Sequence, residues 1–328
     1  MSGPAECAVY VDMGTTNTRV WLAREGEILA RAQARAGVAD TARDGSSARV
    51  RSALRDLILE VRSEPDCAPG RVVAAGMITS PLGLAEVRHV PAPAGVAELA
   101  AAAERHSFPD LTDLPVLLVP GVRTGPVGCD RGTVGECDVM RGEETLCAGL
   151  VALGMVRPPA AVLNLGSHWK AIKLDGEGRV SESLTSLSGE LIYAAQTQTI
   201  LASAVPHAKP AVVEAGWAAA GMREQRRAGL PRALFCVRLL EQSAGSRPEE
   251  RLAYLVGAFV AADLDALLAR RVLTPDRLVA ITGGGALADF WAHALAEASI
   301  PARTITEAEV EQALLAGLRA ISSFKPHI

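Results

Sequence analysis

A short apolar run near the start of the chain is interrupted by a carboxylate, a glycine and two hydroxyls. In VYVDMGTTNTRVW (9–21), Asp12, Gly14, Thr15 and Thr16 stand between two stretches that are typical of buried strands. A glycine in the turn lets the backbone approach a ligand, and the threonines offer amide and hydroxyl donors. We therefore expect a β-hairpin whose turn binds phosphate oxygens.

The carboxylate of Asp12 needs its own explanation, because it would repel a phosphate in a partly dry cleft. A divalent cation between the two groups removes this conflict. The sequence therefore favours Asp12 as a Mg²⁺ ligand, either direct or through water. The alternative interpretation is that Asp12 and the threonines only stabilise a tight turn through side-chain-to-backbone hydrogen bonds.

The same pattern recurs in the second half of the chain, in AVLNLGSHWKAIKLDGEGRV (161–180). Superposing Gly166 on Gly14, an offset of 166 − 14 = 152, aligns Ser167 with Thr15 without a gap. Both copies contain an apolar strand, a polar-x-Gly-hydroxyl turn, a second strand, a glycine turn and a third strand. We therefore expect two similar lobes, each with its own phosphate-binding hairpin.

Length and composition agree with two lobes of an α/β protein. A chain of 328 residues with 49% hydrophobic residues can bury a sizeable core and is long enough for two packed lobes. We place the N-terminal lobe at 1–150 and the C-terminal lobe at 151–328, with the last helix as a candidate to return to the first lobe. The expected elements of the first lobe are strands at 9–11, 19–23 and from 28, a helix over 47–63, a strand over 71–80, a helix over 94–106, a strand from 115, a mobile connection over 121–135 and a helix over 143–156.

The composition favours small-molecule chemistry over a nucleic-acid or membrane partner. The 33 basic and 37 acidic residues leave a formal net charge of −4 and a pI near 5.9, so no basic footprint is present. The longest uninterrupted apolar run, 146–156, is too short to span a bilayer, and no basic start followed by an apolar segment appears. We expect a cytoplasmic protein.

The cysteines form no C-x-x-C pair and no compact framework. This spacing predicts inert thiols that serve as small buried apolar residues in a reducing compartment. The residues concerned are Cys7, Cys67, Cys129, Cys137, Cys147 and Cys236.

A late glycine cluster is a second candidate nucleotide site. Gly283, Gly284 and Gly285 follow an apolar strand and precede a helix expected from Ala286. Glycines there would allow the close approach of a base or ribose, with the helix N-terminus turned toward phosphate. A plain glycine-rich turn is the competing interpretation. The chain contains neither a P-loop nor a dinucleotide-binding fingerprint.

The two hairpins and the strand-GGG-helix segment together resemble the sugar kinase/hexokinase/actin/Hsp70 superfamily. Other segments are similar to 2-dehydro-3-deoxygalactonokinases, namely AAGMITS (74–80), VPAPAG (90–95), DVMRGEET (138–145), GSHWK (166–170) and SLSGELIYAAQTQTIL (186–201). The resemblance implies a two-lobed actin-like ATPase fold with ribonuclease H-like lobes, each a mixed sheet flanked by helices. It also implies a kinase that uses ATP and Mg²⁺ to phosphorylate 2-dehydro-3-deoxy-D-galactonate at its terminal 6-hydroxyl in galactonate catabolism.

The resemblance assigns the two hairpins to the nucleotide phosphates. Thr15, Thr16 and Arg19 would contribute from the first hairpin, and Gly166 and Ser167 from the second. Thr15 and Arg19 match the threonine and arginine that touch nucleotide phosphate in related carbohydrate kinases. For Arg19, a surface cation on the second strand is the alternative interpretation.

The segment around DVMRGEET is expected to carry the base and part of the sugar site. Asp138 precedes the helix expected from Glu143, at the expected junction of the lobes, where the superfamily's hexose kinases have their catalytic aspartate. It could instead be a carboxylate that serves only the helix N-terminus. Arg141, Glu143, Glu144 and Ser80 are candidates for holding the sugar acid, the arginine by a bidentate contact with the carboxylate.

The chain departs from the family pattern in ways that bear on its substrate. Met13 stands where the family usually has tryptophan, GSHWKA replaces G-T-H-S-K-W, and Pro81 stands where an arginine is usual. That arginine could have met the substrate carboxylate, so a kinase of another small sugar or sugar acid is an alternative. A same-fold ATPase and a non-enzymatic sugar sensor are others. The oligomeric state is open as well, a homodimer being one option.

Overall fold

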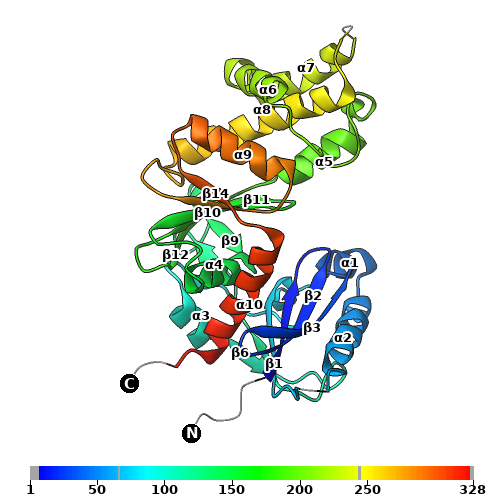
Figure 1. Cartoon of the computed structure of the whole chain (residues 1–328), viewed down its shortest axis with the longest axis vertical. Coiled ribbons are helices and arrows are strands. Elements are labelled where there is room, and N and C mark those ends of the chain that lie inside the picture. Colours follow the sequence, from blue (N-terminus) through cyan, green and yellow to red (C-terminus); the bar gives the residue numbers. More distant parts are fainter. Residues whose placement is uncertain (1–6, 66, 243–244, 326–328) are drawn as a thin grey trace. The chain divides into compact units, whose positions relative to one another are not determined.

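The computed structural model describes residues 7–65, 67–242 and 245–325. The chain divides into two compact units, and in each of them helices pack on a mixed β-sheet (Figure 1). Unit 1 comprises Met1–Pro158, Asp175–Ser181 and Val310–Ile328, and unit 2 comprises Pro159–Leu174 and Glu182–Glu309.

Unit 1 is built on the antiparallel meander that the sequence predicts. The strands of its main sheet are β1 (Cys7–Met13), β2 (Thr18–Arg24), β3 (Glu27–Ala34), β4 (Val72–Gly76), β6 (Glu104–His106) and β7 (Val116–Leu118). Their order in the sheet is β3-β2-β1-β4-β7-β6, with β1 antiparallel to β2 and parallel to β4. A smaller sheet has the order β5-β8-β9 and consists of β5 (Val90–Pro91), β8 (Val122–Thr124) and β9 (Asp138–Met140).

The helices of unit 1 cover the meander and support its turns. They are α1 (Val38–Asp44), α2 (Ala48–Arg62), α3 (Val96–Ala102), α4 (Glu143–Ala152) and, from Val310 on, α10 (Glu307–Ser323), with short 3₁₀ turns η1 (Met77–Thr79) and η2 (Val134–Glu136). The predicted helix over 47–63 is confirmed as α2. Its apolar residues recur at helical spacing and are buried with the strand residues Val9 and Val11.

Helices α4 and α10 meet backbone to backbone. A Cβ on Gly149 would lie 1.7 Å from the carbonyl oxygen of Ala313, and a Cβ on Gly317 would lie 1.9 Å from that of Thr145. The indole nitrogen of Trp21 in β2 also donates a hydrogen bond to the α10 carboxylate Glu311, at 2.7 Å. The end of the chain is therefore an integral part of unit 1.

Unit 2 repeats the meander of unit 1. Its strands are β10 (Ala160–Leu165), β11 (Trp169–Leu174), β13 (Val279–Thr282), β14 (Ala302–Thr304) and, from Glu182 on, β12 (Val180–Ser186). The order β12-β11-β10-β13-β14 matches β3-β2-β1-β4-β7, and β10 is antiparallel to β11 and parallel to β13. Gly26 and Gly178, which are 178 − 26 = 152 residues apart, both have positive φ in the corresponding turn. The repeat inferred from the sequence is therefore present in the structure.

The helices of unit 2 pack on α8 and on the sheet: α6 and α7 lie along α8 (Figure 1), and α9 lies on β13 and β14. They are α5 (Ser188–Gln198), α6 (Ala215–Ala228), α7 (Leu230–Gln242), α8 (Pro248–Ala269) and α9 (Ala286–Glu297), with a 3₁₀ turn η3 (Ile200–Ser203). Among the described residues, α8 is the one helix that is long and apolar enough to cross a membrane. Two thirds of its apolar window is buried, as expected of the core helix of unit 2.

Several predicted elements end earlier than expected. The strand expected over 71–80 ends at Gly76 and continues as η1, and the helix over 143–156 ends at Ala152. The helix expected over 94–106 is wrong in its last turn, because 104–106 form the edge strand β6 beside β7. The connection over 121–135 contains β8, which pairs with β9. In β6 and β8, strand pairing decides the structure over local propensity.

The expectation of six inert thiols is wrong for four cysteines. Cys7 at the start of β1 and Cys67 before the neighbouring strand β4 form a disulfide, with Cα atoms 6.2 Å apart. Cys129 and Cys137 form another, with Cα atoms 6.3 Å apart. Parallel pairing of strands that are distant in sequence brings the first pair together, so spacing alone did not reveal it. Cys147 and Cys236 are free, the former fully buried.

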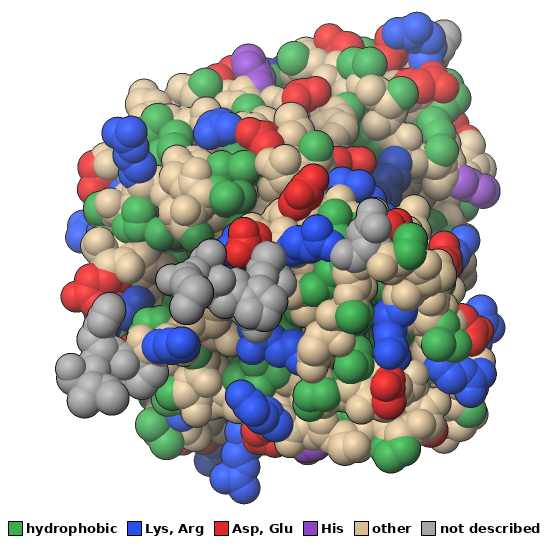
Figure 2. All heavy atoms as spheres, turned by 60° about the horizontal axis from the view of Figure 1, so that its bottom comes forward, with side chains coloured by type: hydrophobic (Ala, Val, Ile, Leu, Met, Phe, Trp, Pro, Cys, Tyr) green, Lys and Arg blue, Asp and Glu red, His purple; other side chains and the backbone are tan. Residues whose placement is uncertain are grey.

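Charged side chains are mixed over the surface drawn in Figure 2. Basic and acidic groups are both spread over this face, among hydrophobic and uncharged side chains. This distribution agrees with the nearly equal counts of the two kinds of residue in the sequence.

Replacing Gly149 by alanine should lower the melting temperature of the protein. The added methyl group would overlap the carbonyl oxygen of Ala313, so the backbones of α4 and α10 must move apart. Overpacking of this kind costs about 1–3 kcal/mol. Calorimetry should compare it with Gly176→Ala, whose Cβ meets nothing within 4 Å and which should leave the transition unchanged. An unshifted transition for Gly149→Ala would contradict the packing of α10 on α4.

Candidate active site

The turn between β1 and β2 presents its hydroxyls to solvent. Thr15 and Thr16 are exposed, and the amide of Gly14 closes the turn by donating to the carbonyl oxygen of Asn17 at 2.8 Å. The predicted hairpin turn is therefore formed, and its threonine side chains are accessible.

The segment before α1 holds this turn from behind. A Cβ on Gly37 would lie 2.4 Å from the carbonyl oxygen of Thr15, and the amide of Ala39 donates to that oxygen at 2.9 Å. Gly37 lies outside the motifs that mark the site in the sequence. One feature of the sequence does point to Gly37. A second glycine, Gly189, stands at the offset of the internal repeat, since 189 − 37 = 152.

Asp12 is a mostly buried carboxylate at the end of β1. Its side chain is 19% exposed, and its Oδ2 lies 3.5 Å from a guanidinium nitrogen of Arg19, its partner across the strand pair. Burial raises the pKa of Asp12 to about 6; Arg19 opposes this rise, and the nearby charge of Glu143 adds to it. Three of the predicted site residues, Asp12, Arg19 and Glu143, are thus close enough for their charges to interact.

Two glycines that the sequence analysis did not single out make room around Asp12. A Cβ on Gly76 would lie 2.4 Å from the carbonyl oxygen of Met13 and 3.3 Å from Oδ1 of Asp12. A Cβ on Gly142 would lie 3.4 Å from the Cα of Gly76. Both have positive φ, which favours glycine. The ends of β1 and β4 and the start of α4 therefore meet around one carboxylate.

Asp138 lies at the start of β9, opposite Thr124 of β8. It is half-buried, and its Oδ1 accepts a hydrogen bond from the amide of Val139 at 2.9 Å. Four residues later the same segment reaches Gly142 beside Asp12, and α4 begins at Glu143 as the sequence predicts.

Arg141 and Ser80 both form hydrogen bonds to the segment that follows β4. Arg141 donates to Oγ1 of Thr79 at 2.8 Å and to the carbonyl oxygen of Val87 at 2.9 Å. Burial lowers the pKa of Arg141, although nearby carboxylates act in the opposite direction. The hydroxyl of Ser80 donates to the carbonyl oxygen of Met77 at 2.7 Å. Both side chains therefore help to hold the segment 77–89 in its conformation.

Glu144 is fully buried and serves the start of its own helix. Its two carboxylate oxygens accept hydrogen bonds from the amide of Gly142 at 2.8 and 2.9 Å. A carboxylate in this position also favours the positive end of the helix dipole. Glu144 is therefore a structural residue of α4, whereas the charge of Glu143 acts on Asp12.

The second hairpin and the glycine cluster lie together in unit 2. Gly166 and Ser167 are exposed in the turn between β10 and β11. A Cβ on Gly283 would lie 2.5 Å from the carbonyl oxygen of Leu165, the residue just before this turn, and Gly283 has positive φ. The structure thus brings together two segments that are more than 100 positions apart in the sequence.

The glycine cluster leads into α9 and a small cavity. Gly284 lies beside the side chain of Glu307, and Gly285, with positive φ, precedes the first residue of α9. The cavity has a volume of about 180 Å³. It is lined by Ala211, Val212, Val213, Ala215, Ala286, Asp289, Phe290 and His293. The predicted helix from Ala286 is confirmed.

Replacing Asp12 by asparagine should stabilise the protein at pH 7.5. Because the pKa is near 6 in the folded protein and 3.8 for a carboxyl group free in water, folding leaves a poorly solvated charge above pH 6. A shift of this size corresponds to about 1–3 kcal/mol. The advantage should shrink as the pH falls from 6 toward 4, where the wild-type carboxyl is itself protonated in the folded state.

Urea unfolding at pH 7.5 and pH 4.5 measures this effect. Asp56→Asn, at an exposed carboxylate of α2, provides the matched control and should behave like wild type at both pH values. If Asp12→Asn were less stable than wild type at pH 7.5, the interpretation of Asp12 as a turn-stabilising residue would be favoured.

Comparisons with known proteins identify the fold. A solved structure from Sinorhizobium meliloti, described as a "putative 2-dehydro-3-deoxygalactonokinase protein", is 27% identical with a TM-score of 0.77, over 96% of this chain and 98% of that one. A ligand-bound xylulose kinase from Lactobacillus acidophilus is 12% identical with a TM-score of 0.52, over 96% and 89%. The activator of 2-hydroxyisocaproyl-CoA dehydratase from Clostridium difficile, with bound ADPNP, is 13% identical with a TM-score of 0.51, over 96% and 94%.

These similarities confirm the predicted actin-like ATPase fold, in which sugar kinases are built. Among curated proteins, no match to the chain was found. A family model for 2-keto-3-deoxy-galactonokinase matches residues 12–321, which include the turns of both hairpins, the segment around Asp138 and the glycine cluster. The chain therefore belongs to the 2-keto-3-deoxy-galactonokinase family and is a carbohydrate kinase.

Proposed function

We propose that this carbohydrate kinase transfers the γ-phosphoryl group of ATP to the terminal 6-hydroxyl of 2-dehydro-3-deoxy-D-galactonate. The product is 2-dehydro-3-deoxy-6-phosphogalactonate, formed in galactonate catabolism in the cytoplasm. The family match over 12–321 carries this proposal, because it spans every segment assigned to the site. The hydroxyl proton leaves to a base as the bond from the hydroxyl oxygen to phosphorus forms, and ADP is the leaving group.

The two hairpins bind the nucleotide phosphates in this proposal. In unit 1 the phosphate-binding residues are Thr15, Thr16 and Arg19. In unit 2 they are Gly166 and Ser167. Exposure of both turns supports the assignment, as does the charge of Arg19 beside Asp12. Binding of ADPNP by the Clostridium difficile protein of the same fold is consistent with a nucleotide site.

The cavity at the start of α9 is proposed to hold the adenine ring. Its volume of about 180 Å³ is below the roughly 300–1,000 Å³ of pockets that enclose a whole small ligand. An apolar lining with Phe290 suits one flat ring, while Asp289 and His293 offer polar atoms at its edge. Gly283, Gly284 and Gly285 then allow the ribose and phosphates to approach the backbone between this cavity and the second hairpin.

The residues around Asp12 fit Mg²⁺. Carboxylate oxygens are the hard ligands that Mg²⁺ prefers, and Mg²⁺ usually binds to one or two carboxylates together with water and substrate phosphates. Asp12 has a raised pKa because its charge is poorly solvated, and Glu143 adds a second negative charge nearby. Asp12 would hold the ion, which when bound neutralises charge on the phosphate oxygens.

Asp138 is proposed as the base for the attacking hydroxyl. The amide of Val139 fixes the orientation of its carboxylate, and partial burial keeps it from being fully solvated. A positioned carboxylate can accept the hydroxyl proton as the phosphoryl group is transferred.

Arg141, Glu143 and Ser80 are assigned to the sugar-acid side. Arg141 and Ser80 would act partly by shaping the segment 77–89 to which they already bond. The positive charge of Arg141 would also attract the substrate carboxylate.

Substrate preference is the direct test of the proposed function. ATP-dependent ADP release should be fastest with 2-dehydro-3-deoxy-D-galactonate among 2-keto-3-deoxy sugar acids, and slow with neutral hexoses. Glucose and galactose are the controls for the need for a carboxylate. Equal or faster turnover of these hexoses would overturn the substrate class, and equal ADP release without any sugar would favour an ATPase.

Replacing Asp138 by asparagine should lower kcat by about 10²–10⁴-fold, the usual contribution of a positioned general base. ATP binding and the melting temperature should stay close to wild type, because the amide keeps the size of the side chain. Asp130→Asn changes another carboxylate in the preceding loop and should keep its kcat, since Asp130 bonds within its own turn. A folded, ATP-binding Asp138→Asn variant with at least a third of normal kcat would remove Asp138 from the mechanism.

A further inference from the structure

We propose that Asp263 of α8 is a positioning residue for ATP, which acts through the start of α5 on the second hairpin. This inference rests on the proposed function, because it assumes that Gly166 and Ser167 bind ATP phosphate. The residues that carry it all belong to unit 2.

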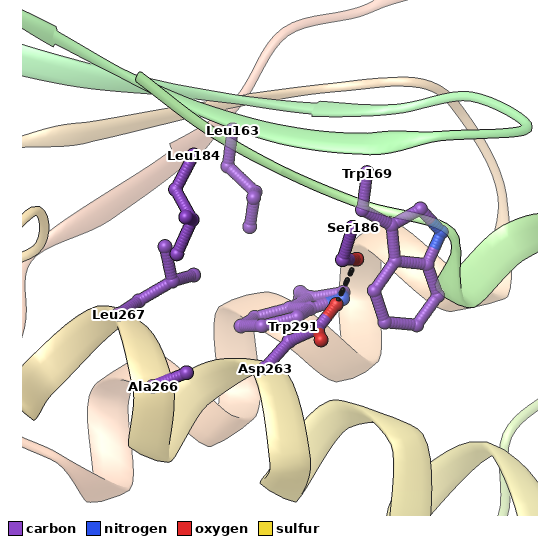
Figure 3. Close-up of a pocket in the computed structure, with 8 residues that line it drawn as sticks. All are labelled: Leu163, Trp169, Leu184, Ser186, Asp263, Ala266, Leu267 and Trp291. Atoms are coloured by element: carbon purple, nitrogen blue, oxygen red, sulfur yellow. Dashed lines mark hydrogen bonds between the residues drawn. The ribbon is translucent and has the colours of Figure 1, made fainter. Parts of the chain in front are cut away.

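Asp263 is tied to the junction of β12 and α5. The hydroxyl of Ser186 donates to Oδ2 of Asp263 at 2.5 Å, as the dashed line in Figure 3 shows. The hydroxyl of Ser188 lies 3.1 Å from that of Ser186 and also bonds to Asp263. A half-buried carboxylate on the core helix α8 thus holds the two serines that precede and begin α5.

The space beside Asp263 is too small for a ligand. The cavity has a volume of about 20 Å³, close to the minimum that one water molecule needs. Figure 3 shows that, apart from Asp263 and Ser186, the residues that line it are aliphatic or aromatic and include Trp169 and Trp291. The two indole rings meet edge to face, with centroids 5.6 Å apart. The hydrogen bonds of the Asp263 carboxylate to Ser186 and Ser188 are therefore its contacts on this side.

The start of α5 lies directly against the second hairpin. A Cβ on Gly189 would lie 2.5 Å from the carbonyl oxygen of Gly166 and 2.6 Å from that of Ser167. Nε2 of His168 lies 3.4 Å from Oε2 of Glu190 in the first turn of α5. Any shift of α5 therefore moves the turn that presents Gly166 and Ser167.

The second hairpin also contacts the small cavity next to Asp263, through the residue at the start of β11. Trp169, the residue after His168, begins β11 and lines the small cavity next to Asp263. The turn is thus held between α5 on one side and the packed indole on the other. Asp263 is the polar group that fixes the start of α5 through its hydrogen bond from Ser186.

At the corresponding turn of unit 1, the carboxylate that bonds to the glycine segment comes from the adjoining helix itself. There, Asp40 of α1 accepts a hydrogen bond from the amide of Gly37 at 3.1 Å, within one helical turn. Gly189 occupies the position of Gly37 in the repeat, but its helix is secured by Asp263 from another helix. This difference makes the second hairpin sensitive to a residue of α8.

The experiment compares Asp263→Ala and Asp263→Asn with wild type by calorimetric titration with ATP. Removing the carboxylate should raise the Kd for ATP by about tenfold, the effect of losing a hydrogen bond to a charged group. The KM for the sugar acid should change less than twofold. Ser186→Ala should change the Kd in the same direction. Hydrogen exchange in the peptide covering 164–170 should become faster in all three variants.

Asp265→Asn is the matched control. Asp265 lies on the same helix and pairs with Arg226 on the surface, so its loss should change neither the Kd for ATP nor the exchange of the hairpin. An unchanged Kd in the Asp263 variants would overturn the inference. It would also be overturned if the melting temperature fell and the affinities for ATP and sugar acid fell equally, because Asp263 would then be only structural.

The experiments distinguish failure of the positioning role of Asp263 from failure of the proposed function. Failure of the wild type to phosphorylate the sugar acid, with ATP binding that depends on Asp263, would overturn the substrate and support the positioning role. Failure of the wild type to bind ATP would overturn both.

Discussion

Close contact between a glycine and the carbonyl oxygens of a hairpin turn is the constraint on which both units depend. Gly37 lies against Thr15 in unit 1, and Gly189 lies against Gly166 and Ser167 in unit 2. Any side chain at these glycines would displace the turn. The helix after the third strand therefore sets the position of the turn, and the meander, the helix and the turn must be repeated as one piece. The constant offset of 152 residues reflects this requirement (189 − 37 = 166 − 14).

The two hairpins differ chemically where their geometry agrees. Asp12 ends β1 as a poorly solvated carboxylate, whereas Asn164, 152 residues later, is neutral and accepts a hydrogen bond from Thr282 at 3.0 Å. The side-chain amide of Asn164 has a hydrogen-bond partner and carries no charge. The carboxylate of Asp12 carries a charge that water solvates poorly. The free-energy cost of a poorly solvated charge therefore falls on the hairpin that contains Asp12, and the hairpin that contains Asn164 does not carry it.

Local pattern predicted the parts of the fold that depend on neighbouring residues. The hairpins, the buried face of α2 and the start of α9 follow from periodicity and glycine placement, and the structure confirms them. What sequence could not predict depends on contacts between distant segments: Gly76 and Gly142 around Asp12, and Asp263 behind the second hairpin. The bonds of Arg141 to the 79–87 segment belong to the same class, because its acceptors are a backbone oxygen and a hydroxyl that no motif marks.

The contribution of α10 to unit 1 has a consequence for how the protein is made. The first 158 residues leave the ribosome without the helix that seats against Gly149 and accepts the indole hydrogen bond of Trp21. About 150 further residues must be translated before that helix appears, which takes roughly 8–30 s at about 5–20 residues per second. During this interval Gly149 and Trp21 lack the contacts with α10 that they make in the finished protein. Full-length synthesis, rather than the completion of the first meander, closes the core of unit 1.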